Sequence, residues 1–139
     1  MQHLLLNNGV RIPVLGFGVF QIPDHEECER VVQQALAVGY RLIDTAQAYD
    51  NEEAVGRAIK SSGVPRADIF LTSKVWVSNS GEQAAMASIE ESLRKLDTDY
   101  LDLMLIHQPF GDYYGTYRAL ERALKEGKWS LEAVNIRDY

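Results

Sequence analysis

The sequence has little of what several classes of protein require. Its single cysteine, Cys28, excludes an intramolecular disulfide and favours a reducing compartment. It contains no run of about 20 apolar residues, so we expect no membrane-spanning helix. Residues 1–4 hold no basic segment that leads into an apolar run, so we expect no secretory signal peptide and predict a cytoplasmic protein.

Positive charge is also scarce. Lysine and arginine together number 14 against 20 aspartates and glutamates, which gives a formal net charge of −6. Binding to nucleic acid needs a clustered cationic face, and the sequence holds no such cluster. We therefore expect neither a nucleic acid nor a membrane as partner. The 46% hydrophobic and 24% charged residues are ordinary for one globular domain of 139 residues.

The residues that are present alternate between strand and helix patterns. The chain opens on a predicted hairpin, 4–6 and 10–12, because the Asn-Gly pair between them favours the positive φ angles of a tight turn. We expect Pro13 to end this pairing, and an apolar run with glycines follows over 14–20. Apolar residues at helical spacing then predict four helices, and short apolar runs predict strands at 42–43, 69–73 and 101–106.

Two of the predicted helices carry start signals. Asp24 with Glu27, and Ser80 with Gln83, have the spacing of capping boxes. Cys28 falls on the apolar stripe of the first of these helices, so we expect it to be a buried packing thiol and not a nucleophile.

Strands separated by helices imply parallel pairing. An open doubly wound sheet and a closed barrel both have that pattern. An open nucleotide-binding sheet would carry a glycine-rich phosphate turn after its first strand, and Gly16-Phe17-Gly18 lacks the third glycine. We therefore predict an α/β fold of the (βα)8 TIM-barrel type. Because a complete barrel takes about 250 residues, 1–139 would form one N-terminal portion: the hairpin, about four βα units and the beginning of a fifth strand.

Four reactive side chains stand at or just after the ends of successive predicted strands. Asp44 ends the second strand and Tyr49 lies in its following loop, while Lys74 and His107 end the next two. In barrel enzymes the chemistry lies at this carboxyl end of the strands, where the βα loops converge. Each residue alone has a structural explanation, such as a buried ion pair or a core histidine. Together they form a coherent proton-transfer set, and we predict that they cluster.

The residue types indicate the reaction. A tyrosine is a weak acid at neutral pH, and a nearby ammonium group such as that of Lys74 stabilises the phenolate that forms when it gives up its proton. Asp44 can orient Lys74, and His107 can polarise a substrate carbonyl. No side chain donates hydride, so a nicotinamide cofactor is implied. One histidine and one aspartate from separate strands are too few for a zinc site, and we expect no metal.

At these residues the sequence closely resembles the aldo-keto reductase family. The motifs that carry the resemblance are Leu15-Gly16-Phe17-Gly18, Leu42-Ile43-Asp44-Thr45-Ala46, Tyr49 with Asn51-Glu52, Thr72-Ser73-Lys74 and Leu105-Ile106-His107-Gln108-Pro109. The resemblance implies a (βα)8 barrel that reduces small aldehydes and ketones with NADPH, or NADH, and a catalytic tetrad of Asp44, Tyr49, Lys74 and His107 with Tyr49 as the general acid. It also implies cofactor contacts at Gly18, Val19 and Asp44, and a substrate pocket lined by Phe20, Trp76, His107 and Gln108.

The family pattern ends at about Lys128. Residues 129–139 lack the serine of the Ser-Asn pair that family members carry in a fifth strand, and Glu132 interrupts their apolar run. We therefore weigh two hypotheses for the chain. One is an NADPH-dependent carbonyl reductase; the other is a catalytically silent half-barrel that acts as an oligomerising or binding module through its exposed sheet edges. Since the rest of the cofactor site would lie beyond these motifs, NADPH binding is the property that separates the two.

Overall fold

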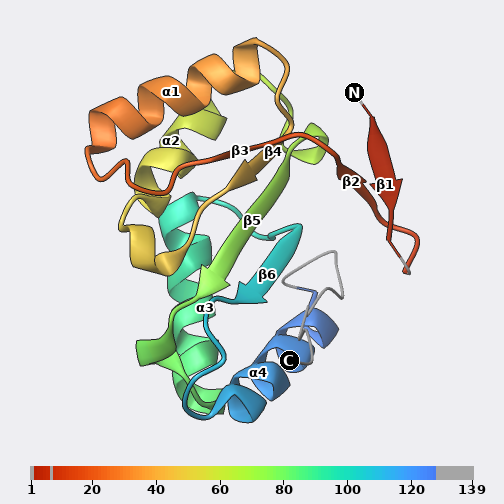
Figure 1. Cartoon of the computed structure of the whole chain (residues 1–139), viewed down its shortest axis with the longest axis vertical. Helices are drawn as coiled ribbons and strands as arrows, with labels where there is room; N and C mark the ends of the chain where they lie inside the picture. The colour runs from red at the N-terminus through yellow and green to blue at the C-terminus, as the bar shows by residue number, and fades with distance from the viewer. Residues whose placement is uncertain (1, 7, 128–139) are drawn as a thin grey trace.

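A four-stranded parallel sheet forms the centre of the molecule (Figure 1). The computed structural model describes residues 2–6 and 8–127. The spatial order of the strands follows the chain: β3 (Gly16–Gly18), β4 (Leu42–Asp44), β5 (Phe70–Val75) and β6 (Leu103–Ile106). Each adjacent pair is parallel, as the strand–helix alternation predicted. The predicted fifth strand and the divergent tail at 129–139 lie outside the described residues.

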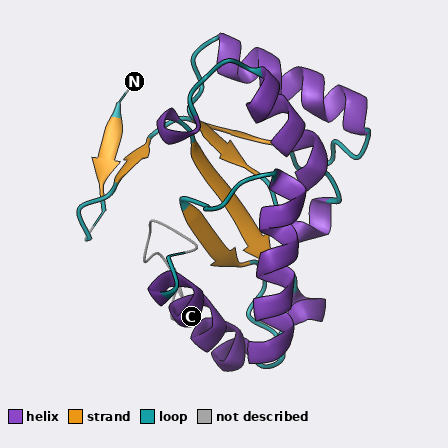
Figure 2. Ribbon diagram, turned by 180° about the vertical axis from the view of Figure 1, so that it is seen from behind, coloured by secondary structure: helices purple, strands orange, loops and turns teal. Residues whose placement is uncertain are grey.

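Four helices form a curved layer along one side of this sheet (Figure 2). They are α1 (His25–Ala37), α2 (Glu52–Ser61), α3 (Glu82–Leu96) and α4 (Tyr113–Lys125). Helices that are neighbours in the chain also pack against one another. Short 3-10 turns stand in the loops: η1 (Gln47–Tyr49), η2 (Arg66–Asp68) and η3 (Val77–Asn79). Within the described ranges, no helix has both the length and the hydropathy needed to cross a bilayer.

The core lies between the helices and the face of the sheet that they cover. It contains the apolar stripes that the helical spacing predicted, including Cys28, whose side chain is fully buried. From the sheet it takes the residues that point toward the helices, Ile43, Leu71, Val75 and Met104. Alternate residues of a strand point to opposite faces, so the neighbours of these four residues lie on the other face.

The two predicted capping boxes have different outcomes. The Asp24 carboxylate accepts a hydrogen bond from the backbone N–H of Glu27 at 2.8 Å, which confirms the cap of α1. The capping box predicted from Ser80 was wrong. The N-cap of α3 is Gly81, at φ +97°, and its N–H donates to the Thr116 hydroxyl at 3.0 Å. The contact with α4 decides this cap, and glycine readily adopts the positive φ that it requires.

The predicted hairpin is present and stands apart from the central sheet (Figure 1). It pairs β1 (His3–Leu5) with β2 (Arg11–Pro13) in antiparallel register. The expectation that Pro13 ends the pairing was wrong: Pro13 is paired with His3, and the next N–H, that of Val14, donates to the Gln2 carbonyl at 3.0 Å. A two-stranded sheet has only edge strands, where proline is tolerated because its missing N–H need not be paired.

Candidate active site

The register of the sheet carries three of the predicted side chains to one end of one face. Asp44 is paired with Thr72 on β5, and Lys74 stands two residues farther along the same strand. Lys74 is in turn paired with Leu105 on β6, and His107 follows two residues later. The N–H of His107 still bonds to the Val75 carbonyl at 3.1 Å. Because side chains alternate with a period of two, Asp44, Lys74 and His107 share the face that the helices do not cover.

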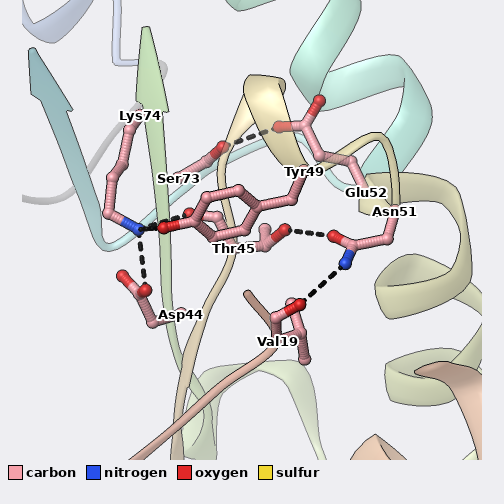
Figure 3. Close-up of polar contacts among 8 residues, drawn as sticks. All are labelled: Val19, Asp44, Thr45, Tyr49, Asn51, Glu52, Ser73 and Lys74. Carbon is pink, nitrogen blue, oxygen red and sulfur yellow. Dashed lines mark hydrogen bonds and ion pairs between the residues drawn. The ribbon is translucent and has the colours of Figure 1, made fainter. Parts of the chain in front are cut away.

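The Lys74 ammonium group contacts Asp44, Thr45 and Tyr49 and lies at the centre of the cluster (Figure 3). Its Nζ lies 2.7 Å from Asp44 Oδ2, 2.9 Å from the Thr45 carbonyl oxygen and 3.3 Å from Tyr49 Oη. An ammonium group has three N–H donors, so these contacts use all of them. The side chain of Lys74 is only 13% exposed and that of Asp44 32% exposed, which strengthens charge interactions between them relative to water.

Tyr49 reaches the cluster from η1, the turn that follows β4. Its ring centroid lies 5.1 Å from that of Phe20 and 5.6 Å from that of His107. The ring of Trp76, in turn, lies 5.2 Å from that of His107 and nearly edge-on to it. The structure therefore brings together the four side chains of the predicted tetrad and two of the predicted substrate-lining aromatic residues.

The surroundings of His107 favour the neutral form of its imidazole. Burial lowers its pKa from the usual 6.5, the Lys74 ammonium lowers it further, and the Asp44 carboxylate opposes the shift. In the part of the chain that the structure describes, its Nδ1 is buried and has no hydrogen-bond partner. A neutral imidazole has one donor and one acceptor nitrogen, so His107 can donate one hydrogen bond to a substrate oxygen.

The remaining predicted site residues flank this cluster. Gly18 is paired with Asp44, and a Cβ added to Gly18 would meet only Asp44 Oδ2, at 3.9 Å. Val19 is fully buried with its side chain in the core, so only its backbone can face a ligand. Phe20 is 64% exposed above Tyr49, and Gln108 is exposed just beyond His107. The backbone at Gly18 is therefore open to close approach beside Asp44.

Asn51 binds two loops of the site together, a role that the sequence did not reveal. It is the N-cap residue of α2, yet its side chain makes no capping hydrogen bond. Its amide nitrogen donates instead to the carbonyls of Val19 and Ile22, at 3.0 and 3.1 Å, and its amide oxygen accepts from the Thr45 hydroxyl at 2.8 Å. This fully buried side chain holds the loop that carries Phe20 against the loop that carries Tyr49 (Figure 3).

Glu52, the next residue, links the same loop to β5. Its carboxyl group is almost fully buried and accepts a hydrogen bond of 2.6 Å from the hydroxyl of Ser73, the neighbour of Lys74 in the chain. Burial raises the pKa of Glu52, and hydrogen bonds from Ser73 and Ser92 oppose that shift. The motif Asn51-Glu52 directly after the Tyr49 loop was the one signal in the sequence for this pair.

Comparison with known proteins identifies the chain. The model of the Aldo/keto reductase family matches residues 14–134. The chain belongs to this family. Among curated relatives of this aldo-keto reductase chain, the glyoxal reductase of Bacillus subtilis is 47% identical over 135 residues, and the 9,11-endoperoxide prostaglandin H2 reductase of Trypanosoma cruzi is 41% identical over 135 residues. Each alignment covers 96% of this chain but only 48% and 47% of the relative, so the chain spans about half their length.

Solved structures confirm the predicted fold. An aldo/keto reductase from Brucella melitensis superposes with a TM-score of 0.93 at 45% identity, over 98% of this chain and 54% of that one. The aldo-keto reductase of Bombyx mori in complex with NADP gives a TM-score of 0.89 at 32% identity, over 96% and 50% of the two chains. The four parallel strands and their helices therefore correspond to about half of an aldo-keto reductase barrel.

Proposed function

We propose that this aldo-keto reductase chain provides the proton-transfer site for NADPH-dependent reduction of aldehydes and ketones to alcohols. The observation that carries the proposal is the position of the Lys74 ammonium group. It lies 3.3 Å from the Tyr49 hydroxyl while it also binds the Asp44 carboxylate at 2.7 Å. A tyrosine beside a held cation can give up its proton, because the cation stabilises the phenolate left behind.

Each member of the tetrad then has a distinct task. Tyr49 Oη donates its proton to the substrate carbonyl oxygen, and Lys74 stabilises the resulting phenolate. Asp44 keeps Lys74 in position. His107, whose neutral form is favoured because burial and Lys74 lower its pKa, donates a hydrogen bond to the same oxygen and orients it. When bound, NADPH or NADH supplies the hydride that the side chains lack.

Three predicted residues fit a nicotinamide. Gly18 is exposed and leaves the space beside Asp44 open, since an added Cβ would meet only Asp44 Oδ2, at 3.9 Å. The Val19 carbonyl is held in place by Asn51. We propose that Gly18, the backbone of Val19, and Asp44 hold the cofactor; that a family member from Bombyx mori forms a complex with NADP supports the choice of cofactor.

An activity assay with a matched pair of tyrosine variants tests the proposal. Tyr49→Phe should lower aldehyde-dependent NADPH oxidation by about 10²–10⁴-fold, the usual contribution of a general acid, while NADPH affinity stays near that of the unaltered chain. Tyr40→Phe is the control, because Tyr40 packs on Phe17, away from the tetrad. Near-normal turnover by Tyr49→Phe would place the acid elsewhere. Absence of NADPH binding by the unaltered chain would overturn the proposal as a whole.

A second candidate is a module that self-associates. Among the described strands, β3 and β6 each have only one partner, so each exposes an unpaired edge. Four large apolar side chains on the hairpin and before β3 are exposed: Leu4 61%, Leu5 72%, Val14 48% and Leu15 64%. We propose a second copy of this chain as the partner of this apolar surface. Sedimentation should show a dimer that Leu15→Glu converts to a monomer; a monomeric unaltered chain would contradict this candidate.

A further inference from the structure

Gln47 stands two residues before Tyr49 in the same 3-10 turn, and its side chain is saturated with hydrogen bonds. Its amide oxygen accepts from the Trp76 backbone N–H and from Asn79 Nδ2, both at 2.9 Å. Its amide nitrogen donates to the Ser88 carbonyl and to the Ser92 hydroxyl, both at 3.1 Å. A primary amide offers two donors and one oxygen with two lone pairs. The four hydrogen bonds therefore use every donor and lone pair of the Gln47 amide.

The partners dictate the orientation of this amide. A backbone N–H can only donate and a backbone carbonyl can only accept. The oxygen of Gln47 must therefore face Trp76 and its nitrogen must face Ser88, which lies on α3. One side chain thus ties the Tyr49 turn both to the loop after β5 and to a helix of the outer layer.

Gln47 also completes a closed ring of contacts around the site. The Tyr49 ring lies 5.6 Å from the His107 ring, and the His107 ring lies 5.2 Å from the Trp76 ring. The Trp76 backbone returns to Gln47 through its N–H, and η1 joins Gln47 to Tyr49. The ring contacts alone are weak and tolerate sliding. The directional contact with Gln47 ties the Trp76 backbone directly to the turn that carries Tyr49.

We propose that Gln47 is a positioning residue that sets the distance between Tyr49 and Trp76, and with it the width of the slot for the carbonyl substrate. This inference rests on the proposed function, because it takes Tyr49 as the acid and Trp76 as a wall of the substrate pocket. The four hydrogen bonds of the Gln47 side chain go to Trp76, Asn79, Ser88 and Ser92, and thus to none of the tetrad side chains. The effect of Gln47 is on which substrates fit.

Gln33 provides a matched control elsewhere in the fold. Like Gln47 it is half-buried and hydrogen-bonded through its amide, with Nε2 donating to the Ser61 hydroxyl at 2.8 Å. That contact joins α1 to the end of α2. A methionine at either position keeps the length of the side chain and removes the hydrogen bonds, so the pair Gln47→Met and Gln33→Met separates loss of packing from loss of positioning.

The first measurement is hydrogen exchange of the Trp76 amide, which needs no activity. We expect Gln47→Met to speed this exchange about 2- to 10-fold, the effect of losing one net hydrogen bond, and Gln33→Met to leave it unchanged. The second is the ratio of kcat/KM for benzaldehyde to kcat/KM for acetaldehyde. A loosened Trp76 should raise this ratio by about 10-fold in Gln47→Met, the low end of what pocket shape contributes, and not in Gln33→Met.

The outcomes are distinguishable. Unchanged Trp76 exchange in Gln47→Met overturns the inference, as does faster exchange with an unchanged substrate ratio. If Gln47→Met does not fold, Asn79→Ala removes one donor from the same oxygen and should shift exchange and ratio in the same direction by a smaller factor; no shift again overturns it. If the unaltered chain reduces neither aldehyde, the proposed function fails, and the exchange measurement alone decides whether Gln47 positions Trp76.

Discussion

The two faces of the central sheet follow different physical rules. On the face that the helices cover, Ile43, Leu71, Val75 and Met104 are at most 3% exposed. On the opposite face, Phe70 and Thr72 are buried. Toward the carboxyl end of that face, Leu105 and Asp44 are half-buried and Lys74 is 13% exposed. The first face contributes apolar burial, which is the main source of stability. The second keeps charged side chains close to one another on the side that the helices leave uncovered.

A pair of carboxyl groups makes the contrast concrete. Asp44 faces the open side and is neutralised by an ammonium group at 2.7 Å. Glu52, the first residue of α2, lies on the side of the sheet that the helices cover, accepts a hydrogen bond from the Ser73 hydroxyl, and has its pKa raised, above all by burial. The same functional group is paired with a cation on one side of the sheet, and on the other side burial disfavours its charged form.

The largest expected effect is a loss of stability when a residue of the helix-covered face is replaced. Leu71→Ala should lower the free energy of unfolding by about 2–5 kcal/mol, because it leaves a cavity in a fully buried position. Leu105→Ala, at a half-buried position on the opposite face, should cost less than half as much. Urea denaturation of both variants measures the difference. Equal losses would mean that the two faces are not energetically distinct.

The next largest effect is a loss of activity, caused by replacing a residue of the uncovered face and leaving the helix-covered face unchanged. Lys74→Met should lower reductase activity by about 100-fold or more, since it removes the cation beside Tyr49. Its cost in stability should be about 1–3 kcal/mol, because Asp44 and the Thr45 carbonyl lose the donor of a largely buried cluster. Lys60→Met, which removes an exposed pair with Asp97, is the control and should affect neither. Loss of folding in Lys74→Met would show that the cluster is a structural ion pair.

Asn51 joins the loop after β3 to the loop after β4. Its replacement should have an intermediate effect on stability. Asn51→Ala leaves the carbonyls of Val19 and Ile22 without their donor, which should cost about 1–3 kcal/mol. Asn51→Asp keeps an acceptor for Thr45 but removes both donors and buries a carboxyl group against two carbonyl oxygens, so it should be at least as destabilising. Thermal denaturation of the two variants checks this order. A fully stable Asn51→Asp would show that the loop carbonyls need no donor.

A smaller effect is the pH dependence that His107 imposes. Its pKa is lowered in the folded state, so the unfolded state takes up this proton first as the pH falls through 6.5. The folded state should therefore lose stability from about pH 7.5 to about pH 5.5. In His107→Asn the same pH interval should have a smaller effect, measured by urea midpoints at both pH values. Identical slopes for the two proteins would remove His107 as the cause.

The smallest expected effect concerns Cys28, which lies in the core beneath the helix-covered face. Burial is the main cause that raises the pKa of its thiol, to about 11, and the thiolate is the reactive form. Iodoacetamide at neutral pH should therefore leave the folded protein unmodified and alkylate Cys28 only after unfolding, as mass spectrometry would record. Rapid alkylation of the folded chain is the outcome that contradicts a closed core at this helix.

Local patterns predicted most of the fold. The apolar stripe of α1, the cap at Asp24 and the strand positions of Asp44, Lys74 and His107 all depend on residues close in the sequence. Periodicity and strand order therefore sufficed to predict that these side chains would converge. The roles of the tetrad stay predictions until the variants are assayed.

Only the tertiary structure decided how the loops are held. Ser80 has the sequence of a cap, yet the contact of Gly81 with Thr116, 35 residues away, sets the start of α3. Asn51 stands at an N-cap but donates across to Val19, and Gln47 looks like any polar loop residue until Trp76 lies beside it. A side-chain amide or hydroxyl bonds to whichever partner packing brings within about 3 Å. Such partners come from distant segments of the chain. The sequence by itself therefore determined the helices, the strands and their order, and the packing of the loops determined which hydrogen bonds hold the site together.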